Sequence, residues 1–482
     1  MEAVPLLPAC GDPTPSQRVT REDLLTFVSA AFACTGQREF HSDGRGQQIS
    51  IKFLHDYVVG NYRRLYARML ACGINHFNQA EIVLRLLATG KHVRPGDRAE
   101  ENALVTRALE RLPTQRAMRL VSRLAEEGVN NRRTRAIVAR YLSRPESRDF
   151  RAVKYRRHVR RGMLHAHVAF PDETAAFLGA GIEKRRFTTP LFEQFRAARH
   201  SERAVYELPF TIAEGLARKH GIPRATFLEK IAPKMTVNER LRFQETTRKE
   251  LGESVALDVG RLGPTRLATF VLGLPAHVRE ARRAELDAAL EASAARAARA
   301  TGVRYAKVAC VLDRSWSASG SSEKRRRPLA VAVAAGRFLA AVSDEARSFW
   351  TEPVEDDLAV TARGATDLAT PILAALAWKP ELLVVVSDGF ENDPPEVAGD
   401  LLAAARRRGL CPFVIHVNPV FDDASIGPKP LTQRFPDLVP TFGIRDAEDI
   451  PTAVAFSAFA HGAASLAELE ATLATRTEAF LA

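Results

Sequence analysis

The stretch that most constrains the fold of this chain is VACVLDRSWSASG, residues 308–320, where an apolar run passes directly into a polar loop. Asp313, Ser315 and Ser317 alternate in that loop, so an extended backbone places one carboxylate and two hydroxyls on the same side. Oxygen ligands of this kind suit a hard divalent cation. Alone the pattern is weak, because Asp and Ser are ordinary loop residues.

Two later stretches add to this pattern. GATDLATP places Thr366 and Asp367 in a glycine-containing loop before a helix, and LLVVVSDG places Asp388 where a second apolar strand ends. The carboxyl ends of parallel strands share one edge of a sheet, and ligands bind there. We therefore expect five oxygen-bearing side chains to meet around one ion: Asp313, Ser315, Ser317, Thr366 and Asp388.

These motifs resemble the metal-ion-dependent adhesion site (MIDAS) of von Willebrand A domains. The resemblance implies a doubly wound parallel α/β sheet that holds a divalent ion, Mg²⁺ in our interpretation. We expect Ser315, Ser317 and Thr366 as direct ligands, with Asp313 and Asp388 acting partly through water. Neutral hydroxyl ligands leave the ion with Lewis acidity that suits capture of an Asp or Glu from another protein.

A basic run, Lys324 to Arg327, follows shortly after Ser317. One interpretation is that it stands near the metal edge and favours a phosphate ligand. The other is a solvated loop ahead of a helix that Pro328 starts. The sequence alone does not decide between a phosphate-binding role and a solvated loop for this basic run.

Charge divides the chain into two parts. Residues 301–482 carry 18 Lys and Arg against 24 Asp and Glu, a net charge of −6, whereas residues 1–300 carry 51 and 33, a net charge of +18. This asymmetry indicates that the N-terminal part meets a polyanion and that the C-terminal part has another role.

Apolar residues recur at helical spacing from about residue 21 to residue 275. Three examples are the stripes Phe53, Leu54, Tyr57, Val58, Leu65 and Met69; Ile82, Val83, Leu86 and Leu87; and Leu104, Ala108, Leu109 and Leu112. Short polar turns separate the stripes. The pattern predicts an all-α layer of antiparallel helix pairs, as in HEAT-like repeat proteins, although no fixed period is present.

The segment from Asn130 to Gly162 is the most basic in this half. It holds twelve Lys and Arg residues against Glu146 and Asp149, a local charge of +10. Like charges this dense repel one another unless an anion neutralises them, and Tyr141 and Tyr155 could stack on bases. We expect arginine contacts to nucleic acid from Arg132, Arg133, Arg156, Arg157, Arg160 and Arg161. A surface helix pair that keeps the protein soluble is the alternative.

Part of this segment resembles the TROVE module of the Ro autoantigen family. The family pattern reads roughly V-T-K-Y, a basic spacer and G-W-S-H; here Val153, Lys154, Tyr155, Gly162 and His165 match it. Met163 and Leu164 stand where the family has Trp and Ser, and the spacer is two residues longer. The resemblance implies a ring or arc of helical repeats that binds RNA, with Lys154 and His165 among the contacts.

The resemblance extends to the C-terminal part, because Ro-type proteins end in a von Willebrand A domain. GATDLATP resembles their G-G-T-D-C-x-x-P, and FGIRDAEDIPTAVAFS resembles their closing segment. We expect strands near residues 304–312, 382–387 and 411–417 and helices near 328–340, 369–378, 395–408 and 448–460. The chain between Ser317 and VSDEARSFW is short, so an early helix or an edge strand is expected to be trimmed.

The expected domains are a disordered tail (1–20), a helical-repeat RNA-binding domain (21–275), a solvent-exposed helical connector (276–300) and a von Willebrand A-like domain (301–482). The N-terminal stretch has no basic leader and contains four prolines, so we expect a cytoplasmic protein without a membrane segment. Five scattered cysteines argue against a disulfide framework and against a zinc site.

The sequence thus favours a non-catalytic RNA-binding protein of Ro type. The resemblance implies small noncoding, Y-like RNA and the ends of structured or misfolded RNA as ligands, and an exoribonuclease or another protein as a partner of the metal site. One alternative is a protein-interaction scaffold without nucleic acid. A hydrolase is disfavoured, because we find no Walker A loop and no paired general acid and base near the predicted metal residues.

Overall fold

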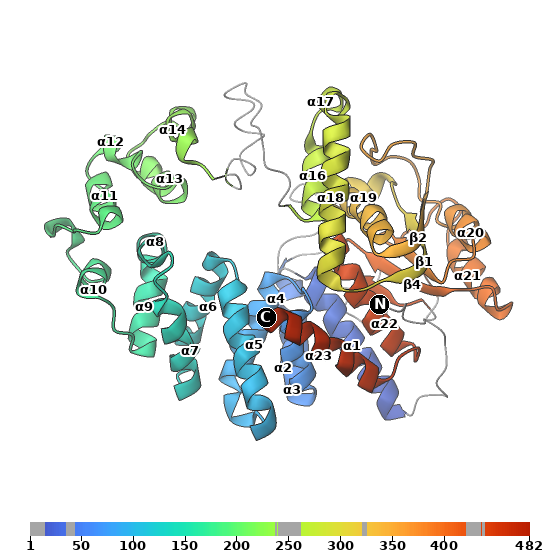
Figure 1. The fold of residues 1–482 in the computed structure, drawn as a ribbon, viewed down its shortest axis with the longest axis horizontal. Coiled ribbons are helices and arrows are strands. Elements are labelled where there is room, and N and C mark those ends of the chain that lie inside the picture. The colour runs from blue at the N-terminus through green and yellow to red at the C-terminus, as the bar shows by residue number, and fades with distance from the viewer. Residues whose placement is uncertain are drawn as a thin grey trace. The chain divides into compact units, whose positions relative to one another are not determined.

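The structure, a computed structural model, describes residues 15–34, 44–236, 239, 262–320, 325–420, 435 and 439–482 (Figure 1). The chain divides into two compact units. Unit 1 combines Met1–Arg85, Arg94–Val105 and Val259–Ala482, and unit 2 combines Leu86–Val93 and Thr106–Asp258. Because unit 1 joins segments that the sequence analysis assigned to different domains, the boundaries expected at 275 and 300 stay a prediction.

Two helices run across the division, α4 (His76–Ala88) and α5 (Arg98–Arg111). The remaining α-helices of unit 2 within the described residues are α6 (Thr114–Glu126), α7 (Arg132–Ser143), α8 (Arg148–Lys154), α9 (Arg156–Ala166), α10 (Asp172–Leu178), α11 (Pro190–Ala198), α12 (Glu202–Val205), α13 (Phe210–Lys219) and α14 (Arg224–Ile231). They pack mainly on helices that are close in sequence, as helical-repeat proteins do.

Helix α9 lies against α6 and α7 through a narrow apolar face. Val159, Gly162 and Ala166 are buried at helical spacing. A Cβ atom at Gly162 would overlap Val121 Cγ1 and come within 3.0 Å of Leu142 Cδ1. The glycine therefore allows α9 to approach α6 and α7 closely, and this fixes which face of α9 is left to solvent.

The helices of unit 1 come from both ends of the chain. They are α1 (Pro15–Ala33), α2 (Gly44–Asn61), α3 (Arg63–Arg68), α16 (Pro264–Gly273), α17 (Ala276–Ala281), α18 (Arg283–Thr301), α19 (Arg327–Ala341), α20 (Ala369–Ala377), α21 (Val397–Arg407), α22 (Ile450–Ala460) and α23 (Leu466–Leu481). Helix α1 packs on α22 and on strand β5 (Thr441–Gly443), where the Ser29 hydroxyl accepts a hydrogen bond from Gly443 N–H at 2.8 Å.

Three local expectations differ from these helices. Residues 15–20 of the expected disordered tail are helical in α1, and residues 1–14 lie outside the described residues. Phe53 and Tyr57 were assigned to a buried stripe but are 68% and 36% exposed. The expected connector is not an exposed helix, because α18 buries Leu286 and Leu290 and packs on α16 and α19.

Unit 1 also contains a five-stranded sheet. Its strands, β1 (Tyr305–Leu312), β2 (Ser343–Trp350), β3 (Leu382–Val386), β4 (Phe413–Asn418) and β5, lie in the order β2-β1-β3-β4-β5. All four pairings are parallel, and Leu312 is in register with Val386. The strand order reverses between β1 and β3, and the crevice at such a switch point is where ligands bind in sheets of this kind.

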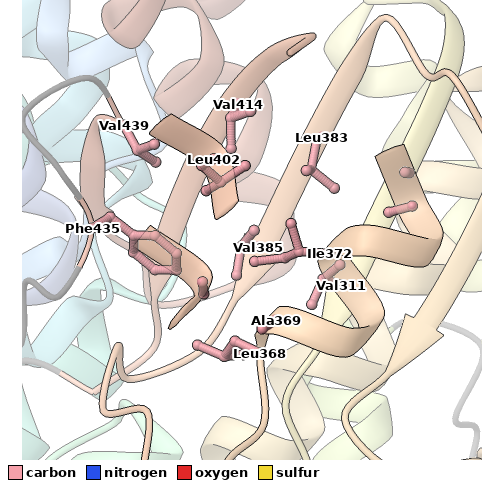
Figure 2. Close-up of a cluster of buried hydrophobic side chains, with 13 residues drawn as sticks. Val311, Leu368, Ala369, Ile372, Leu383, Val385, Leu402, Val414, Phe435 and Val439 are labelled. Atoms are coloured by element: carbon pink, nitrogen blue, oxygen red, sulfur yellow. The ribbon is translucent and has the colours of Figure 1, made fainter. Parts of the chain in front are cut away.

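Helices cover both faces of this sheet, so its central strands read as apolar runs. Alternate residues of β1, β3 and β4, such as Val311, Val385 and Val414, pack against α20 and α21 through Ile372 and Leu402 (Figure 2). Helix α19 contacts β1, β2 and β3. The core thereby holds the ends of β1 and β3 in place, and the loops that follow them emerge at one edge.

The expected fold class, all-α helical repeats with a doubly wound parallel-sheet domain, is confirmed. The expected helices of the sheet domain correspond to α19, α20, α21 and α22 within two residues at each end. The first helix of the sheet domain, α19, is 15 residues long. It is therefore not the element that the short sequence after Ser317 was expected to trim. Among the described helices, none combines the length and the apolar character needed to cross a membrane.

Candidate functional site

The loops after β1 and β3 and the loop before α20 meet at one edge of the sheet. Asp313 N–H donates to the Val386 carbonyl at 3.0 Å, and Trp316 N–H donates to the Gly364 carbonyl at 3.1 Å. Asn392 N–H donates to the Thr366 carbonyl at 3.1 Å. These bonds bring together the three loops that carry the five predicted metal ligands, as the strand-end rule predicted. We call this place the metal edge.

Hydrogen bonds fix the orientation of the polar groups at the metal edge. Asp313 Oδ1 accepts from Ser315 N–H at 2.7 Å, and Asp313 Oδ2 accepts from the Ser387 hydroxyl at 3.0 Å. The hydroxyls of Ser315 and Ser317 lie 3.1 Å apart. Asp313, Ser315, Thr366 and Asp388 are each at most 4% exposed. The two hydroxyls therefore lie together next to a buried carboxylate, but residues Trp316–Ser319 form a short 3-10 helix instead of the extended turn expected from the alternating pattern.

Two buried carboxylates of like charge lie close together at this edge. Burial, and next the charge of Asp388, raise the pKa of Asp313 to about 6. Asp313, Ser317, Ser387 and Asp388 line a hollow of about 10 Å³, which is about the space that one water molecule needs. The predicted direct ligands Ser315 and Thr366 are not among the residues that line this hollow. Two carboxylates and the hydroxyls of Ser317 and Ser387 around so small a space fit a hard cation, which would offset the repulsion between the carboxylates.

A cation at this edge would depend on hydroxyl ligands. Within the described ranges, no group of three or more His, Cys, Asp or Glu side chains is arranged to hold a metal ion. The predicted five-oxygen set contains only two carboxylates, so it is not a group of that kind. The identity of the ion and its ligands stay a prediction.

Sequence reasoning missed two residues that organise the metal edge. The Ser387 hydroxyl donates to Asp313 and accepts from Gly389 N–H at 3.0 Å, which joins the β1 and β3 loops. Glu391 accepts from Ala369 N–H at 3.0 Å and from Ala398 N–H at 2.8 Å, at the starts of α20 and α21. The position of Ser387 beside Asp388 was a usable signal, whereas nothing local marked Glu391.

The second candidate site is the exposed side of α9. Arg156, Arg157, Arg160, Arg161 and Leu164 line one open hollow of about 500 Å³. Their spacing places them on one side of the helix, opposite the buried residues Val159 and Gly162. Leu164 is 62% exposed. We call this surface the arginine face.

The structure does not leave every predicted arginine free for a ligand. Arg156 donates to the carbonyls of Phe177 at 3.0 Å, Leu178 at 3.3 Å and Gly179, at the C-terminal end of α10. Arg161 pairs with Glu126. Arg157 and Arg160 are exposed. The arginine face thus combines two exposed guanidinium groups with two that also have protein partners.

Four other predicted RNA contacts lie outside the arginine face. Lys154 donates to the Thr211 carbonyl, and His165 Nε2 donates to the Val129 carbonyl at 2.9 Å. Arg133 is partly buried and donates to the Leu86 carbonyl at 3.5 Å, whereas Arg132 is exposed at the start of α7. The carbonyl contacts give Lys154 and His165 a packing role, so an RNA contact from either side chain stays a prediction.

The expected base-stacking role of Tyr141 is wrong. Tyr141 is only 6% exposed, and the Arg151 guanidinium lies 5.2 Å from its ring centroid. Arg151 also donates to the Tyr141 and Arg144 carbonyls, so this arginine and this tyrosine belong to the packing of α7 and α8. Tyr155 is partly buried. Tyr141 therefore stabilises the packing of α7 and α8 and does not present an open ring face.

No protein-family model matches the chain, and no curated protein matches it. Among solved structures, the chain is similar to the crystal structure of the Ro (RSR) protein of Deinococcus radiodurans. The identity is 16%, the TM-score is 0.41, and the match covers 83% of this chain and 94% of that chain. At this low similarity, the functional proposals depend on the residues of this chain.

Proposed function

We propose that this chain is a non-catalytic RNA-binding protein of Ro type that holds RNA phosphates on the arginine face. Its ligands would be small noncoding, Y-like RNA and the ends of structured or misfolded RNA. The observation that carries the proposal is the gathering of Arg156, Arg157, Arg160 and Arg161 around one open hollow. Guanidinium groups bind phosphate oxygens in bidentate fashion, and an extended anion neutralises several of them at once.

The proposal also includes a divalent cation at the metal edge. Ser315, Ser317 and Thr366 would hold it together with Asp313 and Asp388, and the hydrogen bonds of Asp313 keep that carboxylate oriented toward the hollow. A bound cation of this kind offers an open position to an oxygen of a partner. An exoribonuclease or another protein is the partner that the sequence resemblance implies, and this stays a prediction.

Salt dependence of RNA binding tests the arginine face. Each phosphate neutralised on a single strand contributes about 0.7 to the slope of log K against log salt, so four contacts give a slope of about −3. We expect this slope for the wild-type chain with single-stranded RNA, measured by fluorescence anisotropy. A slope near zero, or equal affinity for heparin and RNA, contradicts the proposal.

The sharpest variant is Arg157→Glu combined with Arg160→Glu. Both side chains are exposed on α9, so the substitutions remove phosphate contacts without breaking bonds to α10. We expect RNA affinity to fall by at least about 1 kcal/mol for each site and the salt slope to become shallower by about 1 to 2. The matched control is Arg218→Glu, at an exposed position on α13, which should bind RNA like the wild type.

Co-purifying nucleic acid separates this proposal from the protein-interaction scaffold. We expect an absorbance ratio that indicates bound nucleic acid in the wild-type preparation and a lower ratio in the Arg157→Glu, Arg160→Glu variant. Preparations free of nucleic acid, together with unchanged RNA affinity in that variant, would favour the scaffold.

A further inference from the structure

Strand β2 is an open edge of the five-stranded sheet. It stands at one end of the strand order and pairs with β1 alone among the described strands. The other edge, β5, is three residues long and packs on α1, whereas β2 has eight residues. Residues 344–348 are exposed in succession, and their side chains alternate between the two faces of the sheet. A long uncovered edge strand offers its backbone to another strand.

The unpaired side of β2 can be assigned from the register of the sheet. Leu312 is in register with Trp350, and its carbonyl accepts from Thr351 N–H at 3.0 Å. Backbone groups of successive strand residues point to opposite sides, so Arg347, like Thr351, turns its N–H and carbonyl toward β1. Ala346 turns its own backbone groups toward the open side. Within the part of the chain that the structure describes, these outward groups have no backbone partner.

Opposite charges flank Ala346 on this strand. Glu345 precedes it and Arg347 follows it, and side chains two residues apart lie on the same face of the sheet. The Glu345 side chain is 66% exposed and lies 3.8 Å from the Lys307 ammonium group. The Arg347 guanidinium lies 5.2 Å from the Phe349 ring centroid. The first contact is long and the second is not an ion pair, so both charges remain available at the edge.

A second copy of this strand is complementary to it in one register. In an antiparallel pairing with its two-fold axis at Ala346, the outward backbone groups of the two copies bond to each other, and Glu345 of each copy lies opposite Arg347 of the other. An axis at Glu345 would set Glu against Glu, and an axis at Arg347 would set Arg against Arg. Like charges directly opposite destabilise a strand pair, and opposite charges stabilise it. The order of charges on β2 therefore selects the axis at Ala346.

We propose that β2 is a dimerisation edge, at which two copies of this chain join their sheets by antiparallel pairing centred on Ala346. Main-chain hydrogen bonds supply the affinity, and the two pairs between Glu345 and Arg347 fix the register. The same patch serves both copies, so the contact closes on itself and forms a dimer, not a filament. Because the contact is confined to a sheet edge, it buries less surface than an obligate dimer does, and we expect a reversible, concentration-dependent equilibrium.

Charge-reversed variants of the full chain test this pairing by sedimentation equilibrium. The protein is treated with nuclease and kept free of divalent ions, because the inference depends on neither the RNA nor the cation of the proposed function. We expect a monomer–dimer equilibrium for the wild type. Glu345→Arg alone and Arg347→Glu alone each set like charges opposite one another, so each should dimerise about ten-fold or more weakly. Arg407→Glu, at an exposed position on α21, is the control and should dimerise like the wild type.

Mixing the two charge-reversed variants gives the sharpest result. In an equimolar mixture, one copy of each variant restores two opposite-charge pairs across the axis, so the mixture should dimerise like the wild type. Glu345→Arg also loses the contact with Lys307 of its own chain, but mixing cannot repair a loss within one chain. Recovery in the mixture therefore reports contacts between copies.

Ala346→Pro tests the main-chain bonds. Proline removes the outward N–H, and edge strands tolerate proline where the N–H faces solvent. We expect this variant to lose the dimer and to keep the far-ultraviolet circular dichroism spectrum of the wild type.

A wild-type chain that stays monomeric at every concentration overturns the inference. Dimers that persist in both charge-reversed variants and in Ala346→Pro place the contact on another surface and also overturn it. A mixture that dimerises no better than its two components rejects the axis at Ala346. None of these results bears on RNA binding by the arginine face, which is measured separately.

Discussion

Gly162 shows how a single missing side chain determines the arginine face. The expected Cβ overlap with Val121 and the 3.0 Å approach to Leu142 Cδ1 leave no room for alanine. Alanine improves helix propensity by up to about 1 kcal/mol, but overpacking of a tight interface costs about 1–3 kcal/mol. We expect Gly162→Ala to lower the urea midpoint measured by far-ultraviolet circular dichroism. Gly215→Ala, at a helical position with open space, should raise it; the same shift in both variants contradicts the packing argument.

Glu448 gives unit 1 a pH-dependent stability. Burial, and next the charge of Asp446, raise the pKa of this carboxyl group to about 7, and the Thr265 hydroxyl donates to it at 3.4 Å. A carboxyl group with a raised pKa in the folded state binds its proton more tightly there than in the unfolded chain. Its stabilisation is therefore complete below about pH 4.5 and is lost as the pH rises through 7.

Glu448→Gln should remove this loss. We expect the variant to match the wild type near pH 4.5 and to exceed it in unfolding free energy by about 1–3 kcal/mol at pH 8. Urea unfolding followed by tryptophan fluorescence measures the difference. Glu478→Gln, at an exposed position of α23, serves as the control for loss of a surface charge. A stability difference that does not change with pH would show that Glu448 is not the titrating group.

Helix α10 depends on Arg156 at its C-terminal end. The last carbonyls of a helix have no partner within the helix, and the Arg156 guanidinium bonds those of Phe177, Leu178 and Gly179. We expect Arg156→Ala to lower the unfolding free energy by about 1–3 kcal/mol and Arg157→Ala by less than about 0.5 kcal/mol. Circular dichroism in urea compares the two. Equal losses of unfolding free energy in the two variants would mean that the Arg156 contacts contribute nothing to stability. RNA binding by an Arg156 variant must therefore be compared with the stability of that variant.

The meeting of the Asp313 and Asp388 loops at one edge of the sheet could be predicted from the sequence, whereas a cation bound there stays a prediction. A strand-to-loop transition fixes where Asp313 and Asp388 stand, and the parallel order of β1 and β3 brings the two ends together. The expected helices of the sheet domain followed for the same reason, since apolar runs and turn residues mark them directly. Ser387 and Glu391 were missed, because their roles depend on hydrogen bonds between loops.

The roles of individual basic residues could not be predicted, because their partners are distant in sequence. Lys154 bonds a carbonyl 57 residues away, and His165 bonds one 36 residues away. A basic segment indicates a polyanion only through those side chains that folding leaves exposed. The composition of residues 130–162 therefore predicted the charge of α9 correctly but not the separation of Arg157 and Arg160 from Arg156 and Lys154.

The two units carry different candidate sites and can be followed by different spectroscopic signals. Unit 2 carries the arginine face within a stretch of twelve basic residues, and unit 1 carries the carboxylates of the metal edge and all three tryptophans of the chain, Trp316, Trp350 and Trp378. Tryptophan fluorescence therefore reports the unfolding of unit 1, whereas circular dichroism reports both units. This difference allows a ligand effect on the sheet to be separated from an effect on the helical repeats.

Addition of Mg²⁺ should raise the tryptophan-detected unfolding temperature of the wild-type chain. A ligand that binds only the folded state stabilises it by about 2.7 kcal/mol at a concentration 100 times its Kd. Asp313→Asn should abolish this response. Without a cation the same variant should be at least as stable as the wild type, because it relieves repulsion between two buried carboxylates.

Asp367→Asn, which keeps an oxygen to accept from Thr370 N–H, should respond to Mg²⁺ like the wild type. An equal response in Asp313→Asn would place the cation elsewhere, and no response to Mg²⁺, Mn²⁺ or Ca²⁺ in the wild type would remove the metal from the proposed function.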